Sequence, residues 1–509
     1  MALRHNGSQA ETRGFPRRIR TPPCLVVAPS CDPRWCRAVN HHVCFHASKF
    51  ESNRDRSQMS PLCRMGAQVP SSFQLSVLSG TDLALASSRA FTAAASDNLE
   101  IMTYTNVAAT QPAAKPSFIA LLIAVSAVSP LGINMYLPSM PSMARAFGVD
   151  FATIQLTLSL YLAAMAVGQL IIGSLSDRFG RRPVLLIGLL VFVLGSLVCL
   201  TAQNVSLLIF GRVVQAIGGC AGITLSRAIV RDLYGRNQVA SMIGYVTMGM
   251  AVAPMIAPTI GGVLETLYGW RASFVFLMVF GGLILLVAYW QLHETNHNRD
   301  AGGSIQHLVH SYLSLFRSRL FWGYTLAASF VSAVFFAFVA GAPYVTIELM
   351  GRSPAEYGFY FAIVPSGYIL GNFASGRFAG RVGPNRMILA GTFVTLASVA
   401  AMATTFAMGF LHPAALFGPM FFIGLGNGLV LPSGIAGAVS VKPEVAGAAA
   451  GLSGSLQIGF GALVAPVVGA TLGSTIWPLI TIMAICSLFA LASFGLVADR
   501  RRSSPATRL

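Results

Sequence analysis

Charged residues are scarce in this chain: only 10% of its 509 residues are Asp, Glu, Lys or Arg, whereas 54% are hydrophobic. A soluble domain carries roughly a quarter of charged residues. So few charges cannot cover the water-facing surface of a chain this long, and most of the outer surface must face lipid. The scarcity excludes soluble enzymes, nucleic-acid-binding modules and disulfide-stabilised scaffolds, and we expect no nucleic-acid partner.

Lysine is rarer still, and several catalytic motifs are missing. The only lysines are Lys49, Lys115 and Lys442, and none precedes Ser or Thr, so the chain has no P-loop for ATP. It has neither an HExxH motif nor a close DxD pair of acids, which disfavours a membrane enzyme. The net charge of +17 comes almost wholly from arginine, which gathers in the cytoplasmic loops of membrane proteins. We expect no enzyme activity, no cofactor and no metal.

The first 116 residues are arginine-rich and hold five of the eight cysteines. These cysteines form no CxxC pair, so their spacing does not predict a zinc site. No apolar run of signal-peptide length follows the early charges. Two interpretations stay open: a disordered cytoplasmic extension, or residues upstream of the native start, for which Met102 is a natural initiator. We favour the second and leave residues 1–116 out of the predicted fold.

Apolar stretches long enough to cross a bilayer, about 20 residues each, repeat from Ser117 onward. Six occupy residues 117–293, a polar linker covers 294–319, six more occupy 320–498, and a tail follows at 499–509. The sequence thus predicts an all-α membrane protein with twelve transmembrane helices in two pseudo-symmetric six-helix bundles. The expected spans begin at Ser117, Ala152, Val184, Val205, Val239, Ala272, Leu320, Ala355, Met387, Pro413, Val445 and Ser474.

Basic residues lie almost wholly on one side of these spans. The loops on the opposite side offer only Arg145, Arg271 and Arg352. Because basic loops stay in the cytoplasm, we expect both termini and the central linker to be cytoplasmic. The residues on the cytoplasmic side are Arg178, Arg181, Arg182, Arg231, Arg236, Arg299, Arg317, Arg319, Arg381, Arg386, Lys442, Arg500, Arg501, Arg502 and Arg508.

The two halves of the chain repeat one another. GSLSDRFGR at 173–181 aligns with GRFAGRVGP at 376–384, after the second and eighth spans. AxxxAPxxG at 253–261 aligns with GxxxAPxxG at 461–469, in the fifth and eleventh spans. Parallel halves related by an axis along the membrane normal are a transporter architecture, with the substrate site at their interface. The repeat predicts two bundles that rock about a shared central pocket.

Several motifs fall in corresponding spans: GSLSDRFGRRPVL (173–185), GRVVQAIGG (211–219), YLPSMP (136–141), QLTLSLY (155–161), SRAIVRD (226–232) and GWR (269–271). Together they resemble the Bcr/CflA drug efflux transporters of the major facilitator superfamily, over about residues 117–498. The resemblance implies a multi-pass protein of the bacterial inner membrane that exports small amphipathic drugs by proton antiport. The fifth span follows the antiporter motif GX8GX3GPX2GG, with Ala at two Gly positions, through Gly244, Ala253, Ala257, Pro258, Gly261 and Gly262.

The resemblance also implies a conformational latch on the cytoplasmic side. In such transporters a loop aspartate, here Asp177, and an arginine, here Arg181, form a charge relay with an acid at the end of span four, here Asp232. The positive end of helix eleven is a further partner for Asp177. The alternative is a set of ordinary topology-setting arginines beside a solvated aspartate. The latch residues are Gly173, which allows close helix approach, Asp177, Arg178, Gly180, Arg181, Arg182 and Asp232.

Arg212 lies inside an apolar span, where a charge costs about 2.5–3.5 kcal/mol. We interpret it as a cavity-facing arginine that serves substrate binding or proton coupling, with Gln215 one turn away. Snorkelling to the interface is the alternative. The Ala257–Pro258 and Ala465–Pro466 steps are expected to kink spans five and eleven, because proline removes a backbone hydrogen bond. Two roles for these Ala-Pro pairs stay open: close packing that limits leakage through the transporter, or a purely structural kink.

The first span lacks the acid that the resemblance implies just before the Tyr-Leu-Pro step, because Asn134 stands there and cannot titrate. The sequence places no other carboxylate in the middle of a span. The proton carrier of an antiporter therefore stays unassigned among the acids expected near the interfaces. These are Asp177, Asp232, Glu265, Glu348, Glu356 and Glu444.

Polar and aromatic side chains in otherwise aliphatic spans are the candidates for the substrate cavity, since apolar walls with a few polar anchors suit varied amphipathic drugs. Helix packing is the alternative for each one alone. We expect a monomer in the lipid bilayer that exchanges protons for a small molecule; export of a metabolite such as an amino acid, sugar or purine is the alternative function. The candidates are Asn134, Tyr136, Gln155, Tyr161, Phe335, Phe336, Tyr360, Tyr368, Asn372, Asn427 and Gln457.

Overall fold

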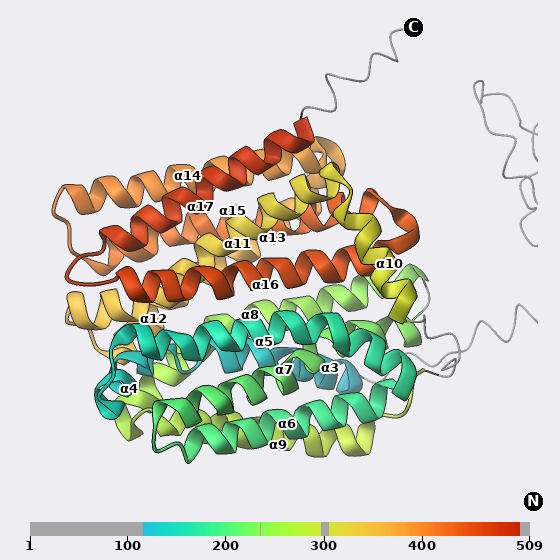
Figure 1. Cartoon of the computed structure of the whole chain (residues 1–509), viewed down its shortest axis with the longest axis horizontal. Helices are drawn as coiled ribbons and strands as arrows, with labels where there is room; N and C mark the ends of the chain where they lie inside the picture. The colour runs from blue at the N-terminus through green and yellow to red at the C-terminus, as the bar shows by residue number, and fades with distance from the viewer. Residues whose placement is uncertain (1–115, 235, 297–304, 499–509) are drawn as a thin grey trace, which may run out of the picture. The chain divides into compact units, whose positions relative to one another are not determined.

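The computed structural model describes residues 116–234, 236–296 and 305–498, and the regular elements in these ranges are all helices (Figure 1). The predictions for the first 115 residues and for the tail after residue 498 lie outside the described residues. The helices before the linker are α3 (Pro116–Asn134), α4 (Met140–Phe147), α5 (Phe151–Phe179), α6 (Arg181–Leu200), α7 (Val205–Leu233), α8 (Arg236–Tyr268) and α9 (Arg271–Gln291).

The later helices follow the same pattern of long rods joined by short turns. A short 3-10 turn, η1 (Leu137–Ser139), precedes α4, and a π-helical turn, η3 (Val345–Leu349), extends α11. The helices from the linker onward are α10 (Ile305–Phe316), α11 (Arg319–Tyr344), α12 (Pro354–Phe361), α13 (Ile363–Val382), α14 (Pro384–Ala407), α15 (Pro413–Ser440), α16 (Ala446–Thr471) and α17 (Trp477–Ala498).

Eleven helical stretches in the described residues are long and apolar enough to cross a membrane. The expected crossing that begins at Ala355 differs, because the chain there forms two helices, α12 and α13, which break at Ala362. Pro365 cannot donate a hydrogen bond to the carbonyl of Phe361, which explains the break. The glycines and Arg377 in α13 lower its hydropathy. This pair still occupies the place of the eighth crossing and packs along α15 and α8.

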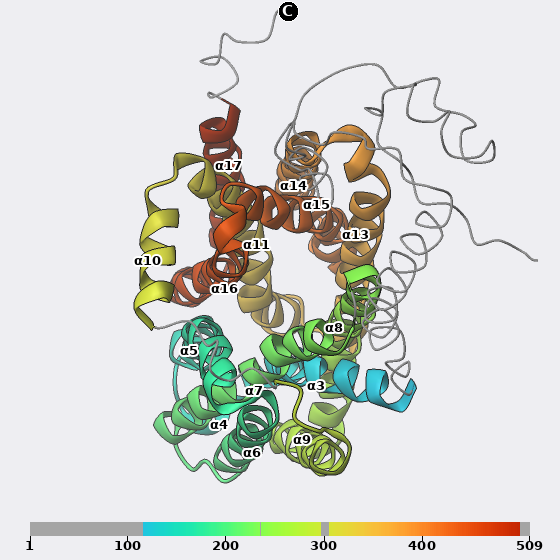
Figure 2. The ribbon, with the colours of Figure 1, turned by 90° about the vertical axis from the view of Figure 1, so that its right-hand side faces the viewer.

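The helices form two groups, which we call the N half (α3–α9) and the C half (α11–α17). Within the N half, α7 packs on α5 and α6; within the C half, α15 packs on α13 and α14, and α11 packs on α17. The halves meet along two lines, α5 with α16 and α8 with α12. Figure 2 shows the two groups end-on, with α10 beside α16. We call the two ends of the bundle the α4 end and the α10 end, after the short helices that lie there.

Glycine allows α6 and α7 to pack backbone to backbone. A Cβ at Gly218 of α7 would overlap the backbone of Phe192 and Gly188, and one at Gly195 of α6 would overlap the backbone of Gln215. Small residues at helix interfaces are the usual means of close packing in a membrane, where apolar side chains gain nothing by leaving lipid. This tight pair holds the residues of the candidate site described below.

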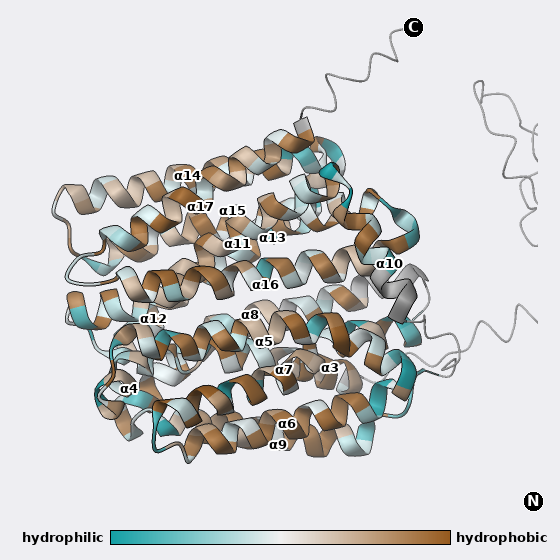
Figure 3. Cartoon of the chain, in the orientation of Figure 1, coloured by the Kyte–Doolittle hydropathy of each residue, from teal (hydrophilic) through white to brown (hydrophobic). Residues whose placement is uncertain are grey.

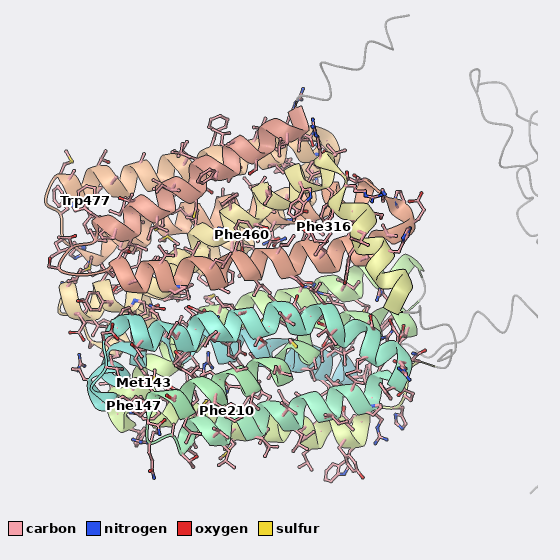
Figure 4. The ribbon with its side chains drawn as sticks, in the orientation of Figure 1. Met143, Phe147, Phe210, Phe316, Phe460 and Trp477 are labelled. Atoms are coloured by element: carbon pink, nitrogen blue, oxygen red, sulfur yellow. The ribbon has the colours of Figure 1, made fainter. Side chains whose placement is uncertain are left out.

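The outer surface of the helices is apolar (Figure 3). Large hydrophobic side chains such as Phe210, Ile187, Trp290 and Phe373 are exposed on different helices, and Phe210 points outward from α7 in Figure 4. Patches of this extent mark a surface that contacts other apolar matter. Polar residues gather at the two ends of the bundle in Figure 3, so the helices present an apolar surface along the length between these ends, as expected for helices that cross a bilayer.

The tight contact between α6 and α7 can be tested with Gly218→Val. The added side chain has no room, so overpacking lowers the free energy of unfolding by about 1–3 kcal/mol, measured as a lower thermal midpoint of the detergent-purified protein. The matched control is Gly282→Val on α9, since nothing lies within 4 Å of a Cβ there. Equal midpoints for both variants would contradict the packing described.

Candidate functional site

Arg212 of α7 is fully buried, although it carries a charge. Its guanidinium lies between two aromatic rings, with the carbon Cζ 4.0 Å from the ring centre of Tyr136 and 4.2 Å from that of Tyr161. The negative ring faces attract a cation, and the attraction is worth about 2 kcal/mol or more per ring away from water. The charge is thus stabilised by π-electron density.

Hydrogen bonds complete the surroundings of Arg212. Nη1 donates to the carbonyl of Gly132 at 2.9 Å and to Oε1 of Gln215, whose Nε2 donates to Ser196 Oγ at 2.7 Å. Nε and Nη2 of Arg212 have no hydrogen-bond partner among the described residues. The guanidinium therefore ties α7 to α3, α5 and α6 at one point. We refer to Arg212, Gln215, Tyr136 and Tyr161 as the arginine cluster.

The arginine cluster corrects one expectation from the sequence. The side chain of Arg212 neither faces a cavity nor snorkels to an interface, because the two rings cover it on both faces. The polar Gln215 is likewise fully buried. Sequence reasoning missed this because a lone charge in an apolar span gives no sign that two tyrosines from other helices surround it.

The predicted latch residues Asp177, Arg181 and Asp232 lie together at the α10 end. Nη1 of Arg181 is 2.5 Å from Oδ1 of Asp177, and its Nε is 3.0 Å from Oδ2 of Asp232. Arg181 is nearly buried, and its Nη1 also donates to Ser176 Oγ at 2.6 Å. Gly180 has a φ of 101°, which turns the chain between α5 and α6 and which other residues rarely adopt. The charges therefore join α5, α6 and α7 of one half.

Glu294, which the sequence analysis missed, completes this cluster. Its carboxylate accepts backbone N–H groups at the start of α6, from Arg181 at 2.9 Å and Arg182 at 3.3 Å. Burial alone would raise the pKa of Glu294, but four backbone N–H donors outweigh it and hold the pKa below its usual value. A carboxylate at a helix N-terminus is also stabilised by the helix dipole. The only signal in the sequence was an acid just past the sixth span.

Other latch residues lie apart from the charge cluster. Arg182 donates to the carbonyl of Tyr289 at 2.9 Å, and Arg178 lies over the ring of its neighbour Phe179. Nothing lies within 4 Å of a Cβ built on Gly173. The expectation that Gly173 allows close helix approach is therefore wrong for this conformation. Asp177 also makes no hydrogen bond or ion pair with α16 in the described part of the chain.

The residues that follow the antiporter pattern lie on α8 and face two partners. A Cβ at Gly261 would overlap the carbonyl of Met135 in the N half, and one at Gly262 would overlap that of Pro354 in α12. Ala253 and Ala257 are buried, whereas a Cβ at Gly244 would meet open space. Pro258 lies inside α8, and its carbonyl lies against Gly358 of α12. The end of the pattern near residue 262 thus forms the contact between halves.

The predicted cavity residues do not form a single site. Tyr136 and Tyr161 belong to the arginine cluster, and Nε2 of Gln155 donates across the halves to the carbonyl of Ala340 in α11. Asn134 is buried, and its Nδ2 donates to the carbonyl of Pro130 at 2.8 Å.

The remaining candidates lie in the C half and bond mainly along their own helices. Asn372 donates to the Tyr368 carbonyl at 2.9 Å, Asn427 to that of Ile423 at 3.2 Å, and Gln457 to Ser453 Oγ at 3.4 Å. The aromatic candidates Phe335, Phe336, Tyr360 and Tyr368 are half-buried.

Carboxylates in the described residues are confined to helix ends and loops. The deepest, Glu265, lies three residues before the end of α8, and its Oε2 is buried without a hydrogen-bond partner. Glu348 forms an ion pair with Arg145 across the halves, and Glu356 caps α12 together with Ser353. Groups of three or more His, Cys, Asp or Glu that could hold a metal ion do not occur in the described ranges.

The helices are long and apolar and fall into two groups. Most of their charges lie near the helix ends, and one arginine is fully buried. These features define a multi-pass membrane transporter. The sequence comparison agrees, since residues 122–457 match the Major Facilitator Superfamily. The chain belongs to this superfamily.

Three relatives confirm the resemblance to drug-resistance transporters. A bicyclomycin resistance protein homolog of Haemophilus influenzae is 29% identical over 76% of this chain and 97% of its own. Multidrug resistance protein D of Escherichia coli is 33% identical over 67% of this chain and 86% of its own. A chloramphenicol resistance protein of Pseudomonas aeruginosa is 33% identical over 64% of this chain and 75% of its own.

A solved structure gives the fold independently. The crystal structure of a bacterial homolog of the human lysosomal transporter Spinster, inward-facing and occupied, matches 77% of this chain and all of its own with a TM-score of 0.60. The two are 17% identical, so the likeness concerns the fold alone. It confirms the predicted major facilitator architecture.

The stacking of Arg212 can be tested with Arg212→Lys. Lysine keeps the charge but lacks the planar group that lies between two rings, so the free energy of unfolding falls by about 2 kcal/mol or more, read from chemical or thermal unfolding in detergent. The control is Arg271→Lys, since Arg271 is exposed and stacks on the single ring of Trp270 at 4.2 Å. If Arg212→Lys cost no more than this control, the cluster would not be stabilised as described.

The lowered pKa of Glu294 predicts a pH dependence of stability. Because the folded-state pKa lies below the unfolded one, the stabilisation is complete above the ordinary glutamate pKa and is lost as the pH falls through the folded-state value. On acidification through that window, the thermal midpoint of the wild type should fall more than that of Glu294→Gln. Glu444→Gln, in the loop before α16, should follow the wild type. Parallel curves for wild type and Glu294→Gln would refute the account.

Proposed function

We propose that this protein exports small amphipathic drugs across the bacterial inner membrane by alternating access, in exchange for protons. Supporting this are its membership of the superfamily and relatives named for resistance to bicyclomycin, chloramphenicol and multiple drugs. The α10 end, which holds the arginine-rich loops, lies in the cytoplasm, as the positive-inside rule favours. The α4 end then faces the periplasm.

The observation that carries the proposal is the unequal contact between the halves. At the α4 end the halves touch through the Arg145–Glu348 ion pair, the Gln155–Ala340 hydrogen bond and the bond from Thr259 Oγ1 to the Gly358 carbonyl at 2.9 Å. At the α10 end, Arg181 and its two acids bond within the N half, and the described residues of the C half offer them no ion pair. A protein closed toward the periplasm, with its cytoplasmic charge cluster disengaged from the C half, fits an inward-facing stage of transport.

Proton exchange requires a group that titrates during the cycle. Asn134 cannot do so, and its buried side chain is already bonded to its own helix. The carrier is then one of the carboxylates at helix ends, where water has access from one side at a time. The Asp177–Arg181–Asp232 cluster connects such carboxylates to the movement of helices α5, α6 and α7.

The experiment is uptake of labelled chloramphenicol into everted membrane vesicles, whose outer surface is the cytoplasmic one. An imposed gradient, acidic inside, should drive accumulation above that of vesicles lacking the protein, and a protonophore should abolish the difference. Asp177→Asn should slow uptake severalfold, because the charge cluster loses an acid. Asp150→Asn is the matched control, since asparagine replaces aspartate well as a helix N-cap.

Two outcomes would contradict the proposal. Uptake that is indifferent to the pH gradient and to the protonophore would reject proton antiport. Vesicles that move a labelled amino acid, sugar or purine but no drug would show that the protein is a metabolite exporter instead.

A further inference from the structure

Arg227 is a second arginine inside α7 that belongs to none of the sites above. It lies six residues before Leu233, the end of the helix, which corresponds to about 9 Å along the axis. Unlike Arg212, its side chain is exposed. An arginine at this depth that remains accessible is costly unless it faces a polar space or a ligand.

The guanidinium of Arg227 is directed toward the junction of the halves. Its Nη2 lies 3.6 Å from the sulfur of Met250 on α8. Arg227 therefore contacts α8, the helix of the N half that packs against α13 of the C half. Snorkelling along α7 to the cytoplasm would not bring it to Met250 in the middle of α8.

No carboxylate neutralises Arg227 in the described residues. Its nearest acid along α7, Asp232, is held by Arg181 and accepts a hydrogen bond from Thr295 at 3.3 Å. The deepest carboxylate, Glu265, lies near the end of α8, whereas Met250 lies near the middle of that helix. The accessible part of this interior therefore carries a positive charge. In a poorly solvated site such a charge attracts anions and acceptor oxygens and repels cations more strongly than it would in water.

We propose that Arg227, with Met250, forms a substrate subsite that selects uncharged or anionic amphipathic molecules with acceptor oxygens over lipophilic cations. The proposal rests on the export function proposed above and adds its substrate class. Arg227 donates charged hydrogen bonds to a nitro, carbonyl or carboxylate oxygen. Met250 supplies an adaptable apolar contact.

The test compares two probes in the everted vesicles: chloramphenicol, which is uncharged and carries nitro and amide oxygens, and tetraphenylphosphonium, a lipophilic cation. The wild type should accumulate chloramphenicol and little of the cation. Arg227→Gln should lower chloramphenicol uptake about tenfold, since a hydrogen bond from a charged donor is lost. Arg227→Lys should restore part of it, and Arg227→Glu should admit the cation. Arg231→Gln, on the same helix one turn closer to the cytoplasm, should leave uptake unchanged.

Binding to the detergent-purified protein separates this proposal from the transport function. Both probes are titrated against the wild type and the Arg227→Gln variant, with the thermal midpoint of each variant as the check on folding. Chloramphenicol should bind the wild type more tightly than the cation, and the variant should lose that preference. If the protein binds with this preference but moves neither probe, the export function fails and the subsite stands. Wild-type protein that binds or transports the cation as well as chloramphenicol, or an Arg227→Gln variant with unchanged preference, would overturn the subsite.

Discussion

The two halves of this transporter contact each other where their backbones lie so close together that no side chain fits between them. At the α4 end, a methyl group on Gly262 would overlap the carbonyl of Pro354, and one on Gly358 would overlap that of Pro258. Two backbones this close leave no space for a solute or water to pass. Helices α8 and α12 meet there by short-range packing and the hydrogen bond from Thr259, and beside them the halves are joined by the Gln155–Ala340 hydrogen bond and the Arg145–Glu348 ion pair. The contact can therefore separate by breaking a few individual bonds. A seal of this kind is what a protein that opens to one face at a time requires.

The arginine cluster has the opposite character, because it holds helices of one half together. Arg212 donates to α3 through the Gly132 carbonyl and stacks on Tyr161 of α5. Moving any of these helices alone would expose a charge to an apolar layer, which is costly. The cluster thus favours movement of the N half as one body. Rigid halves and a separable seal are the two mechanical conditions for rocking bundles.

The hydrophobic pattern and motifs of the sequence predicted much of the fold. Eleven of the twelve expected spans are helices of sufficient length and hydropathy, because a bilayer leaves few alternatives to an apolar helix. The break between α12 and α13 was missed, since a proline in the middle of an expected span, here Pro365, fits either a kink or a break. The resemblance to drug efflux transporters implied that Asp177, Arg181 and Asp232 interact, and in the structure the two acids form ion pairs with Arg181 at the ends of consecutive helices.

Which neighbours each side chain meets could not be predicted in the same way. Polar residues in apolar spans looked alike in the sequence, yet Tyr136 stacks on a buried charge, Gln155 bridges the halves and Asn427 bonds within its own helix. These outcomes depend on the rotation of each helix about its axis, which residues from distant segments decide. Arg227 lay within a recognised motif, but only its contact with Met250 of α8 set it apart from an arginine that determines topology.

The most direct test of the account is the distance between the halves at both ends of the bundle during transport. Spin labels would be attached to a variant freed of its native cysteines, at Arg145 and Glu348 for the α4 end and at Phe179 and Val382 for the α10 end. Pulsed electron resonance with and without chloramphenicol and a low pH should show the two distances changing in opposite directions. Distances that stay fixed, or that lengthen together, would contradict two rigid halves rocking about a central site.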